Sequence, residues 1–331
     1  MQDNNNKHNT GRREFLSSAG KVALGAGFAG VAAGCGAAVT PGDASSSVDY
    51  SSLKYKDNLW NRDAWARLMG DLDFGKEKFG WFKGTVNGVR EGEKVKPLFG
   101  FEGFSVARLV DEGNGSYQKL LREVGFYTDL KTGEVLETFD NPYTGETVKV
   151  VPIANDPFNH HIAPFFPEPP SYGGLNKEKP PKIPLLLDWQ EAPNNTVFLR
   201  TPIHLFYPSA LQPEKWPRES AGKMNRVSEM FTYVINRDEL ADTSQTSITY
   251  SGCWSRITPW LPWMLMGQAE GHIYYDCTMG AYHDDSILSE PVRAYAKKHF
   301  AKYFSAPEKW EDPSLSSLEH YALEQTPAPV K

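Results

Sequence analysis

The sequence predicts a mainly β protein, folded as an antiparallel calycin-like or lipocalin-like barrel or as a strongly curved sheet, with an N-terminal packing helix and C-terminal helices. Three observations predict this class. Short apolar or alternating runs of strand length recur along the chain between turn residues. Phe, Trp and Tyr make up 13% of the residues, and aromatic side chains favour strands and large apolar cavities. Helical periodicity is confined to one early segment and two late ones.

The N-terminus is predicted to be an export signal and not part of the fold. Arg12 and Arg13 precede a Gly/Ala-rich apolar stretch over residues 22–33. This pattern is typical of a twin-arginine signal, which the export machinery recognises on folded proteins. The stretch is too short and too weakly apolar to span a membrane. We therefore predict that residues 1–35 are a signal peptide and that the mature protein is exported, to the periplasm or to the outer side of the cytoplasmic membrane.

Cys35 is a candidate for lipidation. It ends an Ala-Ala-Gly-Cys stretch that resembles the site at which a bacterial lipoprotein is cleaved and acylated. Acylation would tether the protein to the membrane, whereas plain cleavage would release a soluble product, and the sequence leaves both outcomes open. Residues 36–56 are mostly small and polar and are predicted to be a flexible tether. Residues 57–331 are predicted to form a single β-rich domain.

Charge and motifs exclude several classes of function. Residues 1–35 hold four basic and two acidic side chains, so removing them lowers the net formal charge from −6 to −8. An acidic protein is a poor binder of nucleic acid, and we predict no nucleic-acid partner. The motifs G-x-S-x-G, H-E-x-x-H and C-x-x-C are absent, as is G-x-G-x-x-G after a predicted strand, and no G-x-x-x-x-G-K is followed by the Ser or Thr of a phosphate-binding loop. The sequence therefore offers no support for a hydrolase, a nucleotide-binding protein or a zinc protease, and it identifies no cofactor.

The first half of the domain is predicted to be a helix followed by sequential hairpins. Asn61 is a suitable N-cap for a helix with one apolar stripe. This stripe consists of Trp65, Leu68, Met69 and Leu72. Five strand-like runs follow, at residues 78–86, 97–110, 120–128, 134–139 and 147–153. Two of the intervening turns end at Gly133 and Gly145, which can supply the positive φ of a tight connection.

The second half repeats the strand pattern after a break. Residues 164–184 contain seven prolines and two adjacent glycines, which predicts a long loop or lid. Four further strands are predicted at residues 196–207, 229–236, 246–256 and 271–277. Two helices close the chain, one with Pro291 in its first turn and one capped by Asp312. A simple eight-stranded barrel needs little more than half of this chain, so the second half either elaborates one barrel or forms a second half-barrel.

Cys253 and Cys277 are the two cysteines that follow the signal. In an oxidising compartment they are predicted to form a disulfide, with two free thiols as the alternative. A disulfide would place the two strands side by side, with both cysteines on one face.

The faces opposite the two cysteines would then form one polar cluster. Trp254 and Arg256 would lie beside His272 and Tyr274. In this cluster His272 or Tyr274 is a candidate catalytic acid or base, and Arg256 is a candidate holder of a carboxylate or enolate. The alternative is an ordinary polar outer face.

Aromatic residues supply the candidate substrate-binding wall. Trp254, Trp260 and Trp263 belong to the densest aromatic passage of the chain, which would suit a flat apolar ligand such as a terpenoid, a steroid or an aromatic acid. Core packing is the alternative. On an earlier strand, Arg200 and His204 share a face with phenylalanines, opposite an aliphatic face. That mixed face is either a substrate-binding pocket lining or the outside of the sheet.

Histidines and aspartates in the sequence do not have the spacing of a metal site. The candidate ligands are His160, His161, His204, His283, Asp284 and Asp285. Imidazoles and carboxylates bind metals, but these residues form no diagnostic pattern, and we assign no metal.

Several of these features together resemble a known family. They are the twin-arginine start, the early tryptophan-bearing helix, the turn at residues 141–146 and the Trp260-Leu261-Pro262-Trp263-Met264 passage. They resemble the bacterial and fungal family labelled domain of unknown function 1838. The resemblance covers most of the mature chain and implies export and a shared fold, but the family supplies no catalytic residues.

The sequence thus predicts an exported β-barrel protein that binds a small apolar or aromatic molecule. In the enzymatic version it transforms that molecule by acid–base isomerisation or hydration, as an isomerase or lyase without a cofactor. The alternatives are a ligand-binding lipoprotein without catalysis and a structural or interaction protein of the cell envelope.

Overall fold

The structure is a computed structural model and describes residues 48–167 and 181–330. The predicted signal peptide, Cys35, the first part of the predicted tether and the middle of the proline-rich loop or lid lie outside these residues. Among the residues described, no helix is both long and apolar enough to cross a membrane.

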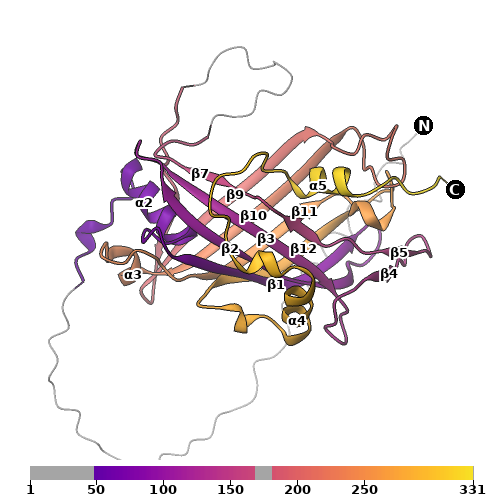
Figure 1. Cartoon of the computed structure of the whole chain (residues 1–331), viewed down its shortest axis with the longest axis horizontal. Coiled ribbons are helices and arrows are strands. Elements are labelled where there is room, and N and C mark those ends of the chain that lie inside the picture. The colour runs from indigo at the N-terminus through magenta and orange to yellow at the C-terminus, as the bar shows by residue number, and fades with distance from the viewer. Residues whose placement is uncertain (1–47, 168–180, 331) are drawn as a thin grey trace, which may run out of the picture. The chain divides into compact units, whose positions relative to one another are not determined.

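One antiparallel sheet of ten strands dominates the described residues (Figure 1). Its strands are β1 (Glu77–Val89), β2 (Lys96–Asp111), β3 (Tyr117–Thr128), β6 (Ile153–Asn155), β7 (His160–Ile162), β8 (Asp188–Ala192), β9 (Thr196–Pro208), β10 (Met224–Asn236), β11 (Ser251–Thr258) and β12 (His272–Tyr282). The strand order is β6-β3-β2-β1-β12-β11-β10-β9-β8, and β7 also pairs with β3. A separate hairpin joins β4 (Thr138–Asp140) to β5 (Thr147–Lys149).

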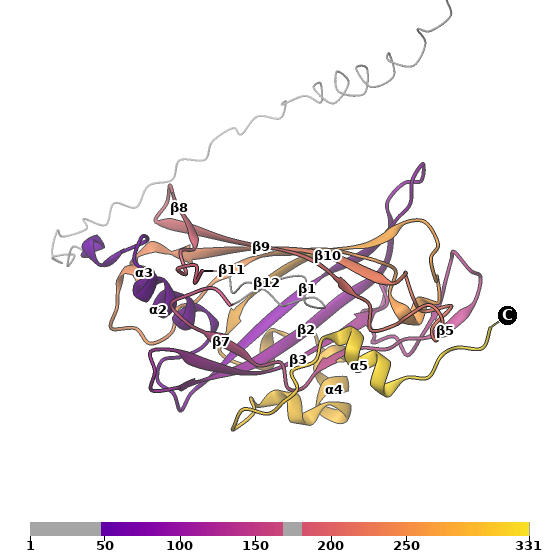
Figure 2. The same cartoon turned by 90° about the horizontal axis from the view of Figure 1, so that it is seen from above.

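The sheet is strongly curved (Figure 2). A first limb of β1, β2 and β3 faces a second limb of β9, β10 and β11, and β12 joins the two. We call the concave side the inner face and the convex side the outer face. Close strand packing accompanies this curvature at Gly103, where a Cβ atom would lie 2.2 Å from the Val124 carbonyl oxygen. Only glycine fits at such an approach.

Helices cover parts of both faces. They are α2 (Asn58–Met69), α3 (Arg237–Ala241), α4 (Glu290–His299) and α5 (Ser317–Glu324), with 3₁₀ turns η1 (Tyr50–Ser52), η3 (Pro262–Met264), η4 (Asp285–Ile287) and η5 (Ala301–Phe304). Helix α2 packs on the inner side, where Trp65 and Tyr233 meet with ring centroids 5.7 Å apart. Helix α4 packs on the outer face of the first limb, with Tyr295 against Phe126 at 5.5 Å.

The prediction of a mainly β, antiparallel, curved sheet is confirmed, and each predicted strand run overlaps an observed strand. The sequence missed β7 and β8. These strands are three and five residues long and lie mostly at the surface. Segments this short and polar carry no clear hydrophobic period, so their pairing with β3 and β9 defines them as strands.

The helix boundaries differ from those predicted. Asp57, and not Asn61, caps α2, because its Oδ1 accepts from the backbone nitrogens of Leu59 and Trp60 at 2.8 and 3.0 Å. Asn61 is buried inside the helix, and its Oδ1 accepts from the Trp189 indole at 2.7 Å. The last helix begins at Ser317 and not after Asp312, because Ser316 and Glu319 form a capping box there.

The end of the predicted tether belongs to the folded body. Tyr50 donates to Asp238 at 2.6 Å, and Ser52 donates to the Ala241 carbonyl at 2.7 Å. The sequence of this segment is small and polar, so only these contacts with α3 distinguish it from a linker.

Candidate ligand-binding pocket

A cavity of about 570 Å³ lies on the inner face, between the two limbs. Its walls come from both limbs, with α2 and the start of α5 contributing side chains. Most of the lining is apolar. Ile203 and Leu205 of β9 are 39% and 42% exposed because they face this open space. Size and lining are those of a small-molecule site, which typically measures about 300–1,000 Å³.

An aromatic cluster around Trp254 forms one wall of the cavity. Its indole lies 5.4 Å from the Tyr275 ring and 6.2 Å from the Phe231 ring. The buried Nε1 of Trp254 has no hydrogen-bond partner among the described residues. Trp260 also lines the cavity, but Trp263 packs into the core at 5.1 Å from Tyr127. Two of the three predicted wall tryptophans therefore reach the pocket.

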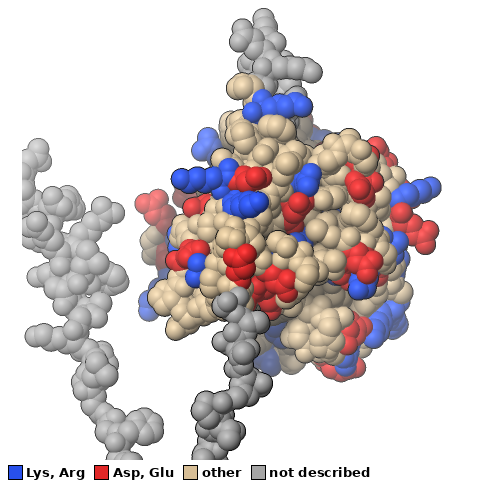
Figure 3. All heavy atoms as spheres, turned by 90° about the vertical axis from the view of Figure 1, so that its left-hand side faces the viewer, with Lys and Arg blue, Asp and Glu red and all other residues tan. Residues whose placement is uncertain are grey.

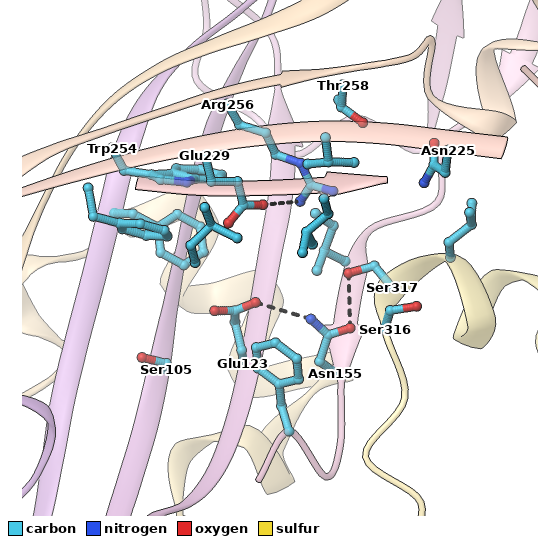
Figure 4. Close-up of a pocket in the computed structure, with 18 of the residues that line it drawn as sticks. Ser105, Glu123, Asn155, Asn225, Glu229, Trp254, Arg256, Thr258, Ser316 and Ser317 are labelled. Atoms are coloured by element: carbon cyan, nitrogen blue, oxygen red, sulfur yellow. Dashed lines mark hydrogen bonds and ion pairs between the residues drawn. The ribbon is translucent and has the colours of Figure 1, made fainter. Parts of the chain in front are cut away.

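Four polar side chains meet in this apolar surrounding, and we call them the carboxylate cluster: Glu123, Asn155, Glu229 and Arg256 (Figure 4). Arg256 pairs with Glu229 at 3.1 Å on the second limb. Asn155 donates to Glu123 at 3.1 Å on the opposite side and accepts from Ser317 at the same distance. Figure 4 shows Glu123 and Glu229 facing one another across the cavity.

The carboxylate cluster has unusual electrostatics. Burial, and secondly the charge of Glu229, raise the pKa of Glu123, and these effects outweigh its bond to Asn155 and the charges of Lys119 and Arg256. Burial opposes the charge of Arg256, but Glu229 and nearby tyrosines raise its pKa overall. The Nε of Arg256 is buried and has no partner within the described part of the chain. The cavity therefore holds a guanidinium group opposite a carboxyl group whose pKa is raised.

The predicted pair of catalytic residues on β12 lies elsewhere. Trp254 is opposite Cys277 in the register of β11 and β12, and Arg256 is opposite Tyr275. His272 and Tyr274 therefore lie on the outer face, while Arg256 lies on the inner face. The predicted cluster of all three is wrong, because a shift of one residue in register moves a side chain to the other face.

The predicted disulfide is wrong for the same reason. Cys253 is opposite Thr278, one residue away from Cys277, so the two thiols point to opposite faces of adjacent strands. Both cysteines are free, Cys253 exposed and Cys277 buried. The prediction that the two strands are neighbours is correct, but their register does not place the two cysteines opposite each other.

Arg200 and His204 do not reach the cavity. Both side chains are exposed on the outer face of β9, and His204 contacts the Ser228 hydroxyl at 3.0 Å. The aliphatic face of the same strand, with Ile203 and Leu205, lines the pocket instead. An apolar cavity uses the apolar face of its strand, so the assignment of the mixed face to substrate binding is wrong.

Sequence reasoning missed most of the carboxylate cluster. One available signal was on β3, where Lys119 and Glu123 share a face with buried Leu121 by alternation. Two charged residues on an apolar strand face indicate either a defect in the core or a polar site in a cavity.

The candidate metal ligands do not gather into a metal site among the described residues. The described residues contain no group of three or more His, Cys, Asp or Glu side chains placed to hold a metal ion. His161 pairs with Glu112 at 3.1 Å, and His283 pairs with Asp284 at 3.5 Å. Acidic and basic side chains are interspersed over the face that carries α2 and α3 (Figure 3).

Comparison with models of protein families gives a match. A family model described as protein of unknown function (DUF1838) matches residues 75–324. The matched segment begins just before β1 and ends with α5, so it includes both limbs and nearly the whole wall of the cavity. No curated protein matches the chain.

Proposed function

We propose a function for this chain, which belongs to the DUF1838 family as its sequence indicated, from the chemistry of its own cavity. The protein binds a small apolar or aromatic molecule that carries one oxygen-bearing polar group, and it transforms that molecule by acid–base isomerisation or hydration. One observation carries this proposal. The carboxylate cluster places an arginine and a carboxyl group with a raised pKa in an otherwise apolar cavity.

Each part of the cavity has a role in this proposal. The aromatic and aliphatic walls bind the flat body of the ligand. Arg256 donates from its guanidinium group to the ligand oxygen, on which negative charge develops. Glu123 supplies a proton at one ligand atom, and the carboxylate of Glu229 accepts one from another, which moves a double bond. Exchange of one proton with solvent resets the two carboxyl groups.

The finer fold class belongs to the same proposal. We propose that the curved sheet is an opened calycin-like barrel, with the ligand on the inside as in closed members of that architecture. This proposal is supported by the two facing limbs and by the exposure of Ile203 and Leu205 to the cavity.

Export also remains a proposal. In it, the twin-arginine signal is recognised by the export machinery, and Cys35 tethers the folded protein outside the cytoplasmic membrane. Replacing both Arg12 and Arg13 by lysine is expected to keep the protein in the cytoplasm in a cell-fractionation experiment. Cys35→Ser is expected to release it from the membrane fraction without preventing export. Export of the double-lysine variant at the normal level would contradict the signal, and Cys35→Ser in the membrane fraction would contradict the tether.

The ligand proposal is tested by titrating purified mature protein with terpenoid, steroid and aromatic acids and following tryptophan fluorescence. Arg256→Gln is expected to weaken binding of an acid about 10- to 100-fold, since a hydrogen bond to a charged group contributes about 1.5–3 kcal/mol. Binding of the matching hydrocarbon should change far less. His272→Ala on the outer face is the control and should bind normally. Equal loss in the two variants would contradict the assignment of the pocket.

Turnover separates the enzymatic version from the binding-only alternative. Glu123→Gln keeps the size of the side chain and its hydrogen-bonding groups but cannot release a proton. It is expected to bind ligand and to abolish its conversion, measured by chromatography of the reaction mixture. A wild-type protein that binds but never converts any member of the panel would support the ligand-binding alternative.

A further inference from the structure

Lys119 is a charged side chain of the cavity that the proposed acid–base chemistry does not use. It lies on β3, on the same face as Glu123, and it lines the cavity beside α2. Its amine contacts the Met69 sulfur at 3.8 Å. Within the described residues it has no oxygen or nitrogen partner at hydrogen-bond distance. A free amine in an apolar cavity has no evident structural purpose.

Lys78 provides the contrast inside the same molecule. Its amine donates to the carbonyls of Arg67 and Ile248 at 2.9 and 2.6 Å and to the Ser247 hydroxyl at 3.0 Å. Lys78 does not line the cavity. Burial lowers the pKa of both amines, to about 7 for Lys78 and to about 8 for Lys119. Lys78 is thus a satisfied structural lysine, while Lys119 is available to a molecule in the cavity.

His160 is the direct neighbour of Lys119. The two residues are opposite each other in the register of β3 and β7, so their side chains leave the sheet on the same face. Both line the cavity. The His160 ring packs edge-to-face on Phe158 with centroids 4.7 Å apart and makes no hydrogen bond within the described part of the chain. Its apolar surroundings and the charge of Lys119 lower its pKa to about 4, so its imidazole is neutral at neutral pH and has one unprotonated ring nitrogen.

We infer that Lys119 binds an apolar aldehyde or ketone covalently as an imine, with His160 carrying the protons. This inference rests on the proposed function, because it names the class of molecule that the cavity accepts. Burial favours the uncharged form of the Lys119 amine, and this form is the nucleophile that carbonyl compounds require. A carbonyl compound also suits the carboxylate cluster, since an imine withdraws electrons from the carbon skeleton on which those groups act.

The step balances without any further reagent. The amine nitrogen attacks the carbonyl carbon, a C–N bond forms, and the electron pair of the C=O bond moves to oxygen. His160 takes the two nitrogen protons one after the other and passes them to that oxygen, so that the first makes it a hydroxyl group and the second protonates the hydroxyl group. That group leaves as water while the C=N bond forms. The overall change is amine plus carbonyl compound to imine plus water, and hydrolysis reverses it.

Borohydride reduction tests the inference. Mature wild-type protein is incubated with cinnamaldehyde, reduced with borohydride, and analysed by intact mass spectrometry and peptide mapping. We expect one stable secondary amine per chain, at least about tenfold enriched at Lys119 over any other lysine. Lys78 is the internal control. Lys119→Arg retains the cation but forms no imine and should lose the adduct, with its thermal unfolding checked against the wild type.

Cinnamyl alcohol separates this inference from the proposed function. The alcohol has the same body and no carbonyl group, and its binding is followed by tryptophan fluorescence. If the alcohol and the aldehyde both bind but no adduct forms at Lys119, the proposed imine is wrong, while the proposal that the cavity binds a ligand is supported. If neither binds and adducts spread over surface lysines, both proposals fail. His160→Phe should slow adduct formation about tenfold at an unchanged final yield, and an unchanged rate would overturn its role as proton carrier.

Discussion

The two faces of the first limb differ in how completely their polar groups are paired. On the outer face, Glu102 is buried and accepts from the Ser289 nitrogen and hydroxyl at 2.6 and 2.8 Å and from Lys83 at 3.0 Å. On the inner face, Lys119 lacks such partners, and Arg256 across the cavity has a buried Nε without one in the part of the chain that the structure describes. Both faces belong to the same strands, so the difference comes from what covers each face.

This difference indicates that polar groups on the outer face stabilise the fold, whereas those on the inner face are open to a ligand. The outer face forms a second hydrophobic core with α4 that includes Phe104, Val124, Phe126 and Val292. There the buried Glu102 helps to fix the start of α4 in place. The inner face keeps a cavity, and unpaired polar atoms in a cavity cost stability unless another molecule binds them. The predictions below test this contrast, beginning with the largest expected effect.

Truncation of Phe104 should show how much the outer-face core under α4 stabilises the protein. Phe104 is fully buried, and its ring lies 4.6 Å from Phe304 and 5.2 Å from Phe79. Phe104→Ala is expected to lower the free energy of unfolding by about 3–5 kcal/mol, measured by denaturant titration. Leu205→Ala, at a side chain that faces the cavity, should cost less than about 1 kcal/mol. Equal costs would remove the distinction between the faces.

Glu102 should matter to stability through its bonds to the start of α4. Glu102→Gln keeps the size of the side chain but loses charge-assisted bonds to Ser289 and the ion pair with Lys83. We expect a loss of about 1–2 kcal/mol in thermal or denaturant unfolding. Glu290→Gln is the control at an exposed position of the same helix, and the loss of its surface ion pair with Arg293 should cost less than about 0.5 kcal/mol. A neutral result for Glu102→Gln would mean that its bonds do not hold α4.

Glu123 should behave in the opposite way. Its raised pKa means that the folded state holds the proton more tightly than the unfolded chain does. Its contribution to stability is therefore present below the ordinary value of 4.5 and is lost as the pH rises through the higher folded value. Glu123→Gln should therefore stabilise the protein at pH 8, raising the melting temperature and increasing the free energy of unfolding by less than about 1 kcal/mol. Near pH 4 the same substitution should have no such effect.

Glu229→Gln is the matched control for that experiment. It removes the partner of Arg256, at 3.1 Å, and leaves a partly buried cation unpaired, so it should lower stability at neutral pH. The inner-face assignment of Glu123 would be contradicted if both variants destabilised the protein to the same extent at pH 8.

The smallest expected effect concerns the two cysteines. Their reactivity tests which side chains of β11 and β12 lie on which face of the sheet. Reductant should not change the melting temperature of the mature protein, because Cys253 and Cys277 are not bonded. In a Cys35→Ser background, a thiol reagent should modify Cys253 in the native state and both thiols only after denaturation. Burial raises the pKa of Cys277 to about 12, which further suppresses its native reactivity. If the reagent modified no thiol in either the native or the denatured protein, the two cysteines would be joined by a disulfide after all.

The sequence by itself determined what depends on neighbours along the chain. Alternating runs located the long strands, and the turns at Gly133 and Gly145 have the positive φ that their glycines predicted, +75° and +70°. These features are local because side-chain alternation and backbone strain act over a few residues. The aromatic passage also led to two residues of the cavity wall, Trp254 and Trp260.

Only the tertiary structure decided which residues share the cavity. Glu123 on β3 meets Glu229 on β10 because the sheet curves, and no pattern within either strand encodes that curvature. The register of β11 against β12 is likewise fixed by packing between distant segments. An offset of one residue there placed Arg256 inside and His272 outside. Strand alternation assigns residues to two faces from the sequence, but only packing across the sheet decides which of those faces is the inner one.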